Sequence, residues 1–216
     1  MERLGNDMRH GTLTRLGFAV SGLLAAAGPV AAHHPTGGMT PSTFMEGFLS
    51  GIGHPVIGID HLAFIIAIGI AAAFMRGGFG IVTAFIAAST VGVLAHVAEL
   101  NIPLVEPLVA ASVIVAGAAL AAGMTSAPIG WLALAAIAGL FHGYAFGETA
   151  VGAERGVIGA YLLGLAFIQA AIAGGAMLMS QRFLLPLGSV SMPMRAAGAI
   201  VASLGVILLA GGLTGA

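Results

Sequence analysis

The chain contains no cysteine and no lysine among its 216 residues. The lack of cysteine excludes disulfides, thiolate metal sites and cysteine nucleophiles. Charged residues make up only 7% of the sequence, whereas a typical soluble domain has about 25%. The basic residues are a few scattered arginines, so no basic patch indicates nucleic-acid binding.

Hydrophobic residues are abundant instead, at 59% of the chain, and the mean hydropathy is +1.07. Glycine is also frequent, with 34 copies. Small residues let helices approach closely in a bilayer, where no hydrophobic driving force acts between them. The composition therefore predicts an all-α integral membrane protein.

The first 32 residues have the layout of a secretory signal peptide. A polar stretch with three arginines, Met1 to Arg15, precedes an apolar run over 16–27 and a helix breaker with small residues up to Ala32. An uncleaved first membrane helix is the alternative. We expect cleavage after Ala32, an extracytoplasmic segment over 33–54 and a membrane domain over 55–216.

Six apolar segments follow, each close to the roughly 20 residues that a bilayer requires. The sequence thus predicts six transmembrane helices after a cleavable N-terminal signal peptide. Pro55 is expected in the first turn of the first helix, where its missing N–H is harmless. The segments lie at about 55–75, 79–100, 104–122, 129–146, 157–179 and 196–213.

Signal-peptide cleavage would leave the mature N-terminus outside, which places Arg76, Arg182 and Arg195 inside. This arrangement agrees with the positive-inside rule. It predicts a multi-pass protein of the bacterial inner membrane with a periplasmic N-terminus.

Imidazoles and carboxylates gather toward the predicted outer ends of the first four segments. Such groups are expensive within a bilayer and by default mark a pathway or a binding site. The pattern predicts a polar funnel that opens to the periplasm. Its members are His54, Asp60, His61, His96, Glu99, Glu106, His142 and Glu148.

Imidazole and carboxylate ligands without thiolate suit divalent Ni, Co, Zn, Cu or Fe. On an ideal helix His54 and His61 would lie roughly 10 Å apart, whereas metal–nitrogen bonds are about 2.0–2.1 Å. One ion can contact both only if the chain near His54 and Pro55 folds back; otherwise they serve successive stations. Asp60 would either bind the ion or orient an imidazole.

Two further pairs are candidates. His96 and Glu99 are three residues apart and would share one helix face. His142 and Glu148 would lie on different faces of a straight helix. Gly143 and Gly147 would let this helix unwind, as helices do at transporter ion sites, or let another backbone approach. The structural alternatives are helix capping by His54, a structural Asp60–His61 or His96–Glu99 pair, and a packing role for His142.

The stretch His54-Pro55-Val56-Ile57-Gly58-Ile59-Asp60-His61, with Glu46-Gly47-Phe48-Leu49 upstream, resembles the signature of the HupE/UreJ family of nickel/cobalt permeases. His142-Gly143-Tyr144-Ala145-Phe146-Gly147-Glu148 resembles its second motif. Phe146 stands where many members carry a second histidine, a departure that bears on the inner site and on metal preference. The signal peptide and the six segments match as well, so the resemblance covers essentially the whole chain.

The resemblance implies a permease for Ni²⁺ or Co²⁺, not an enzyme, without a prosthetic group. His33 and His34 would collect the ion outside. The expected partners are the divalent ion and the lipid bilayer, not nucleic acid; a homo-oligomer or a metalloenzyme maturation partner stays open. The rival functions are a membrane accessory subunit and a haem- or metal-binding membrane oxidoreductase. The predicted metal-handling residues are His54, Asp60, His61, His96, His142 and Glu148.

Overall fold

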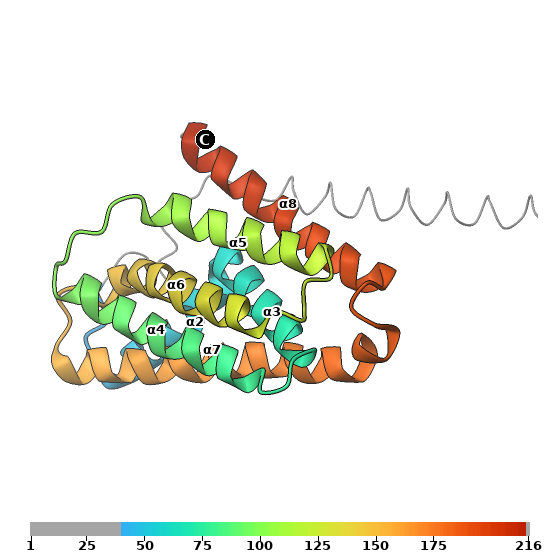
Figure 1. The fold of residues 1–216 in the computed structure, drawn as a ribbon. Helices are drawn as coiled ribbons and strands as arrows, with labels where there is room; N and C mark the ends of the chain where they lie inside the picture. Colours follow the sequence, from blue (N-terminus) through green and yellow to red (C-terminus); the bar gives the residue numbers. More distant parts are fainter. Residues whose placement is uncertain (1–39, 215–216) are drawn as a thin grey trace, which may run out of the picture. The chain divides into compact units, whose positions relative to one another are not determined.

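The computed structural model describes residues 40–214, and every regular element within them is helical. The predicted signal peptide, His33 and His34 lie outside the described residues. The elements, drawn in Figure 1, are α2 (Phe44–Ile57), α3 (Ile59–Ala73), α4 (Phe79–Val97), α5 (Val105–Ala121), α6 (Pro128–Gly147), η1 (Glu148–Ala150), α7 (Arg155–Phe183), η2 (Leu185–Leu187) and α8 (Met192–Thr214).

The first predicted span is not one helix but two, which meet at an angle of 80°. A capping box starts α2: Thr43 accepts from the Glu46 N–H, and the Glu46 carboxylate accepts from the Thr43 N–H. Pro55 therefore lies in the last turn of α2, so its predicted place in the first turn of a helix is wrong. The expected boundary between residues 54 and 55 falls within this helix.

Four helices are long and apolar enough to cross a membrane: α4, α6, α7 and α8. The bent pair of α2 and α3 makes a fifth if it counts as one span. The apolar helix α5 has 17 residues, or about 25 Å, against a hydrocarbon core of about 30 Å. The structure therefore supports four or five of the six predicted spans.

The helices pack most extensively as three pairs: α4 with α6, α5 with α8, and α2 with α7. Helix α3 contacts members of all three pairs, and most of its residues are buried. In the four long helices only 17–39% of the most apolar window is buried, as expected where side chains face lipid. The core that positions the site is thus built around α3.

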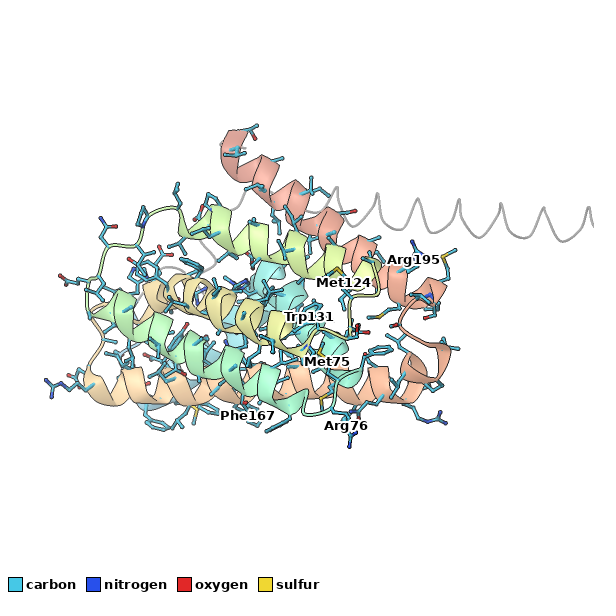
Figure 2. The ribbon with its side chains drawn as sticks, viewed as in Figure 1. Met75, Arg76, Met124, Trp131, Phe167 and Arg195 are labelled. Carbon is cyan, nitrogen blue, oxygen red and sulfur yellow. The ribbon has the colours of Figure 1, made fainter. Side chains whose placement is uncertain are left out.

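One end of the bundle gathers the α3–α4 turn, the α5–α6 loop and the α7–α8 loop. Figure 2 shows Arg76, Met124, Trp131 and Arg195 at this end. The Trp131 indole donates to the Met124 carbonyl at 2.7 Å and ties α6 to the preceding loop. Arg76 and Arg195, two of the three arginines that were predicted to share one side of the membrane, therefore lie at the same end of the bundle.

Candidate functional site

Three histidines from three different helices meet in the interior. His54 lies in the last turn of α2, His61 in the first turn of α3 and His142 in α6, and all three are buried. The ring centroids are 4.9 Å apart for His61 and His142, and 6.0 Å apart for His54 and His61. We call these residues the imidazole cluster.

The bend between α2 and α3 brings His54 and His61 together. Of the two alternatives that the sequence left open, the chain therefore does turn between the two histidines, at Gly58 rather than near His54 and Pro55. A Cβ added at Gly58 would lie 2.6 Å from Cδ2 of His61 and 3.2 Å from Oδ1 of Asp60. Glycine is thus needed here because a larger residue would crowd His61 and Asp60. Its backbone conformation does not require glycine, since a φ of −74° is open to any residue.

The closest contact in the cluster joins Nδ1 of His61 to Nδ1 of His142 at 2.8 Å. The hydrogen bonds around His142 assign its tautomer. Ser112 on α5 donates its hydroxyl hydrogen to the Val109 carbonyl at 2.7 Å, so it must accept from Nε2–H of His142 at 2.9 Å. Neutral His142 therefore presents the lone pair of Nδ1 toward His61.

A second set of hydrogen bonds orients His54. The Tyr161 hydroxyl donates to the Phe146 carbonyl at 2.7 Å, so it can only accept from Nδ1 of His54 at 3.1 Å. Thr149 Oγ1 lies 2.9 Å from the same nitrogen. These two contacts hold the His54 ring in place through Nδ1.

Phe146 stands among these rings. Its centroid lies 4.3 Å from that of His61 and 5.2 Å from that of His54. The position where many relatives are expected to carry histidine thus lies against the cluster, and here it gives the cluster an apolar wall.

Asp60 lies in the first turn of α3, next to the cluster. Its Oδ1 accepts from the backbone N–H of His61 at 2.8 Å and lies 3.8 Å from Nε2 of that residue. A carboxylate at a helix N-terminus is favoured by the helix dipole. Since 3.8 Å is longer than a hydrogen bond, both roles predicted for Asp60, binding the ion and orienting an imidazole, stay predictions.

Two predicted site residues lie outside the cluster. The His96 ring stacks on Tyr144 at 4.2 Å, and its Nδ1 lies 2.6 Å from the Tyr144 carbonyl. Because α4 ends at Val97, Glu99 leaves the helix with a φ of +57°, and the expected His96–Glu99 pair on one helix face is wrong. Glu148 is exposed at the start of η1, next to Thr149.

Of the two effects expected of Gly143 and Gly147, unwinding of α6 is wrong, because the helix continues through Gly147. The close approach of another backbone is confirmed, since a Cβ at Gly143 would collide with the backbone of Ser89 on α4. His142 therefore projects from a regular helix, and Glu148 does not turn toward it.

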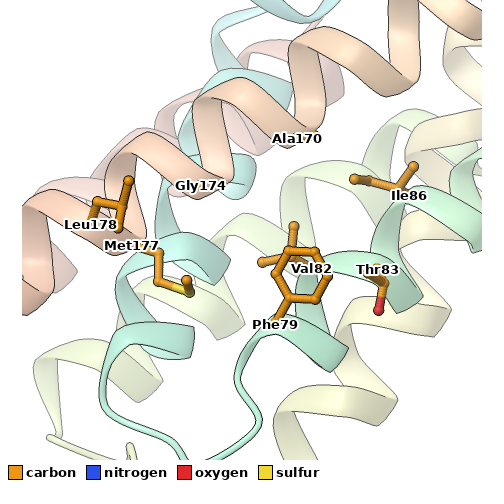
Figure 3. Close-up of a pocket in the computed structure, with 8 residues that line it drawn as sticks. All are labelled: Phe79, Val82, Thr83, Ile86, Ala170, Gly174, Met177 and Leu178. Atoms are coloured by element: carbon orange, nitrogen blue, oxygen red, sulfur yellow. The ribbon is translucent and has the colours of Figure 1, made fainter.

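No group of three histidine, aspartate or glutamate side chains within residues 40–214 is arranged to hold one metal ion. The closest potential ligand pair is His61 with His142. A pocket of about 230 Å³ lies elsewhere, between α4 and α7, with the almost wholly apolar lining that Figure 3 shows. Its polar group, the Thr83 hydroxyl, bonds the Gly80 carbonyl, so the pocket offers nothing that would favour a cation.

Sequence reasoning missed three residues that hold the imidazoles: Ser112, Thr149 and Tyr161. Two of them carried a signal. Ser112 and Tyr161 are polar groups in the middle of apolar segments, where a hydroxyl needs a partner. Thr149 directly follows Glu148, and the carboxylate was taken as the candidate ligand instead.

No curated protein and no solved structure matches the chain. A model of the HupE / UreJ protein family matches residues 21–208, a range that includes every predicted metal-handling residue from His54 to Glu148. The chain therefore belongs to the HupE / UreJ family, whose members are membrane proteins related to nickel and cobalt transport.

Proposed function

We propose that the protein is a permease for divalent nickel or cobalt, and that the imidazole cluster binds the ion in transit. The contact between Nδ1 of His61 and Nδ1 of His142 carries this proposal. Both rings are buried among helices that face lipid, where paired polar groups mark a substrate pathway.

The separation of the two nitrogens fits two ligands of one ion. With metal–nitrogen bonds of about 2.0–2.1 Å, ligands at a right angle stand about 2.9 Å apart and tetrahedral ligands about 3.4 Å apart. The observed 2.8 Å is that of a hydrogen bond, in which Nδ1–H of His61 donates to Nδ1 of His142, so an ion would bind in place of this hydrogen.

Two further residues would contribute to the proposed site. His54 would supply a third ligand after a movement of its ring, since the three histidines as they stand do not hold one ion, and Asp60 would orient His61 and balance the charge of the ion. An incomplete site suits transport, because the ion must bind firmly enough to enter and weakly enough to leave. Metal would come from the periplasmic side of the bacterial inner membrane, with the N-terminus periplasmic.

The remaining predicted ligands have weaker support. His96 and Glu148 lie nearer the end of the bundle than the cluster does, at the ends of α4 and α6. We propose that they attract the ion before it reaches the cluster, as His33 and His34 would do farther out.

Cellular metal content tests the function. Cells that express wild type, His61→Ala or His142→Ala at matched membrane levels would grow in trace nickel and cobalt, with mass spectrometry of the washed cells. Thr83→Ala is the matched control, since it removes a hydroxyl of the apolar pocket between α4 and α7, away from the cluster. We expect wild type and the control to accumulate one of the two metals and the cluster variants to lose this uptake.

If cells that express the wild-type protein accumulate no more nickel or cobalt than cells without the protein, the permease function is wrong. Purified protein that still binds the metal would then favour the accessory-subunit function. Visible absorption by the purified protein would favour an oxidoreductase.

A further inference from the structure

The packing of the helices contains an internal repeat. Two glycines pack against the facing helix in the same way. A Cβ added at either one would meet a backbone carbonyl of that helix and the amide nitrogen four residues later. They are Gly164 of α7, over Phe48 and Ile52 of α2, and Gly92 of α4, over Leu140 and Tyr144 of α6. The α2–α7 contact thus has the same construction as the α6–α4 contact.

The facing sides of these contacts match as well. A Cβ at Gly51 of α2 would collide with the Tyr161 carbonyl of α7, and one at Gly143 of α6 would collide with the Ser89 carbonyl of α4. One helical turn earlier the correspondence repeats at the same spacing. Gly47 meets the Val157 carbonyl and the Ala160 methyl, and Gly139 meets the Phe85 carbonyl and the Ala88 methyl.

In the third helix pair, α5 and α8, the two helices correspond to each other. A Cβ at Gly117 of α5 would collide with the amide nitrogen of Ala202, and one at Gly198 of α8 would collide with the amide nitrogen of Ala121. Each glycine also faces the carbonyl of the other. Such reciprocal contacts arise where two equivalent elements meet at a two-fold axis.

These contacts relate α2, α4 and α5 to α6, α7 and α8, in that order, and leave α3 without a counterpart. Equivalent helices run in opposite directions, which the colours of α4 and α7 in Figure 1 show. This is an inverted-topology repeat. In transporters built this way the substrate site lies where the repeats meet, and the repeats rock to open it to each side in turn.

The imidazole cluster lies at this meeting point, since His54 belongs to the first repeat, His142 to the second and His61 to α3. The repeat also pairs individual positions. Ser50 and His142 each precede the matched glycines Gly51 and Gly143 by one residue, and His54 and Phe146 follow them by three. The first repeat therefore carries its imidazole one turn later than the second.

Ser50 is the position that this pairing adds. Its hydroxyl is buried, with a side chain 2% exposed, and has no hydrogen-bond partner among the described residues. A buried hydroxyl without a partner is unfavourable, and this one lies one turn from His54 on the same helix face.

The two repeats also differ in their arrangement. Helix α5 packs on α6, where Ser112 contacts His142, whereas the corresponding packing of α8 on α2 is weaker. We propose that transport exchanges these two arrangements, and that Ser50 then lines the site from the first repeat as His142 does from the second. This inference rests on the proposed function for the identity of the ion.

The natural lack of cysteine makes the test direct, because a single introduced thiol has no background. Ser50→Cys would be treated with a charged, membrane-impermeant thiol reagent in right-side-out and in inside-out vesicles, with and without nickel. Nickel flux would be measured in the same vesicles. Ser180→Cys is the control, a buried serine of α7 far along the chain from the cluster.

We expect the Ser50→Cys thiol to react from both faces and nickel to slow the reaction at least severalfold, while the control reacts from one face at most. Reaction from one face or from neither, with nickel flux intact, would overturn the exchange and leave the permease function standing. Reaction from both faces without any flux in wild type would support the exchange and overturn the permease function.

Discussion

The two histidine motifs of this protein use their glycines in opposite ways. In the first motif the chain breaks at Gly58, and the 80° bend brings His54 to His61. In the second motif α6 runs straight through Gly143, whose missing side chain admits the backbone of α4. What a glycine does is therefore decided by what lies opposite it, and the local sequence does not record that neighbour.

The largest expected effect comes from filling the space at Gly143. Gly143→Ala would push the α6 backbone away from Ser89, and we expect a loss of stability of about 1–3 kcal/mol, the range for overpacking. Thermal denaturation of the purified protein in detergent measures it. Gly159→Ala is the control, because a Cβ there meets nothing within 4 Å; equal effects of the two variants would contradict the close packing of α4 on α6.

The bend should respond differently, with loss of function in a folded protein. In Gly58→Ala the new methyl would displace the His61 ring, and we expect metal uptake to fall about 10–100-fold, as when groups that position metal ligands are disturbed. Uptake per unit of membrane protein is the measurement. Gly80→Ala, at another open position, should leave uptake unchanged; normal uptake by Gly58→Ala would show that the bend does not hold His61 in place.

The tautomer of His142 gives a smaller and more specific effect. Ser112→Ala removes the acceptor that holds hydrogen on Nε2, so nickel affinity should fall about tenfold, at the low end for such orienting partners. Equilibrium dialysis of the purified protein measures the affinity. Ser112→Thr keeps the hydroxyl and should recover much of the affinity. Unchanged affinity in Ser112→Ala would mean that Nδ1 of His142 is not the binding atom.

The smallest effect is expected at the imidazole outside the cluster. His96→Phe keeps an aromatic ring over Tyr144 and loses one hydrogen bond, worth about 0.5–1.5 kcal/mol. Uptake should stay within about twofold of wild type in the cellular assay, with a slightly lower melting temperature. A collapse of uptake without a change in melting temperature would make His96 essential to transport, and not only a group that attracts the ion.

Much of the architecture could be predicted from the sequence because apolar runs and breakers are local signals. The bounds of α4, α6 and α8 fall within a few residues of the predicted segments. The break at Gly58 could not be predicted, because Ile57-Gly58-Ile59 continues an apolar run and the bend depends on packing around α3. The prediction treated Pro55 as a helix start, whereas the capping box at Thr43 had already begun the helix.

The site could also be predicted in part, because histidines within apolar segments are local signals. His54, His61 and His142 stand out in any reading of a membrane chain, and the structure brings them together. Tyr161 and Ser112 are far from them in sequence, at separations that only the tertiary fold closes. The repeat left few matching residues beyond its glycines, so the correspondence became visible only from the atoms that those glycines face.

The burial of α3 also constrains how the protein is made. With 15 residues, or about 22 Å, α3 is shorter than the hydrocarbon core, and its neighbours include α7 and α8, which are synthesised later. The ribosome therefore delivers His61 well before the helices that enclose it, and the imidazole cluster can form only after α6, which carries His142, has been made. A nascent chain that ends before α6 would contain His54 and His61 without the cluster.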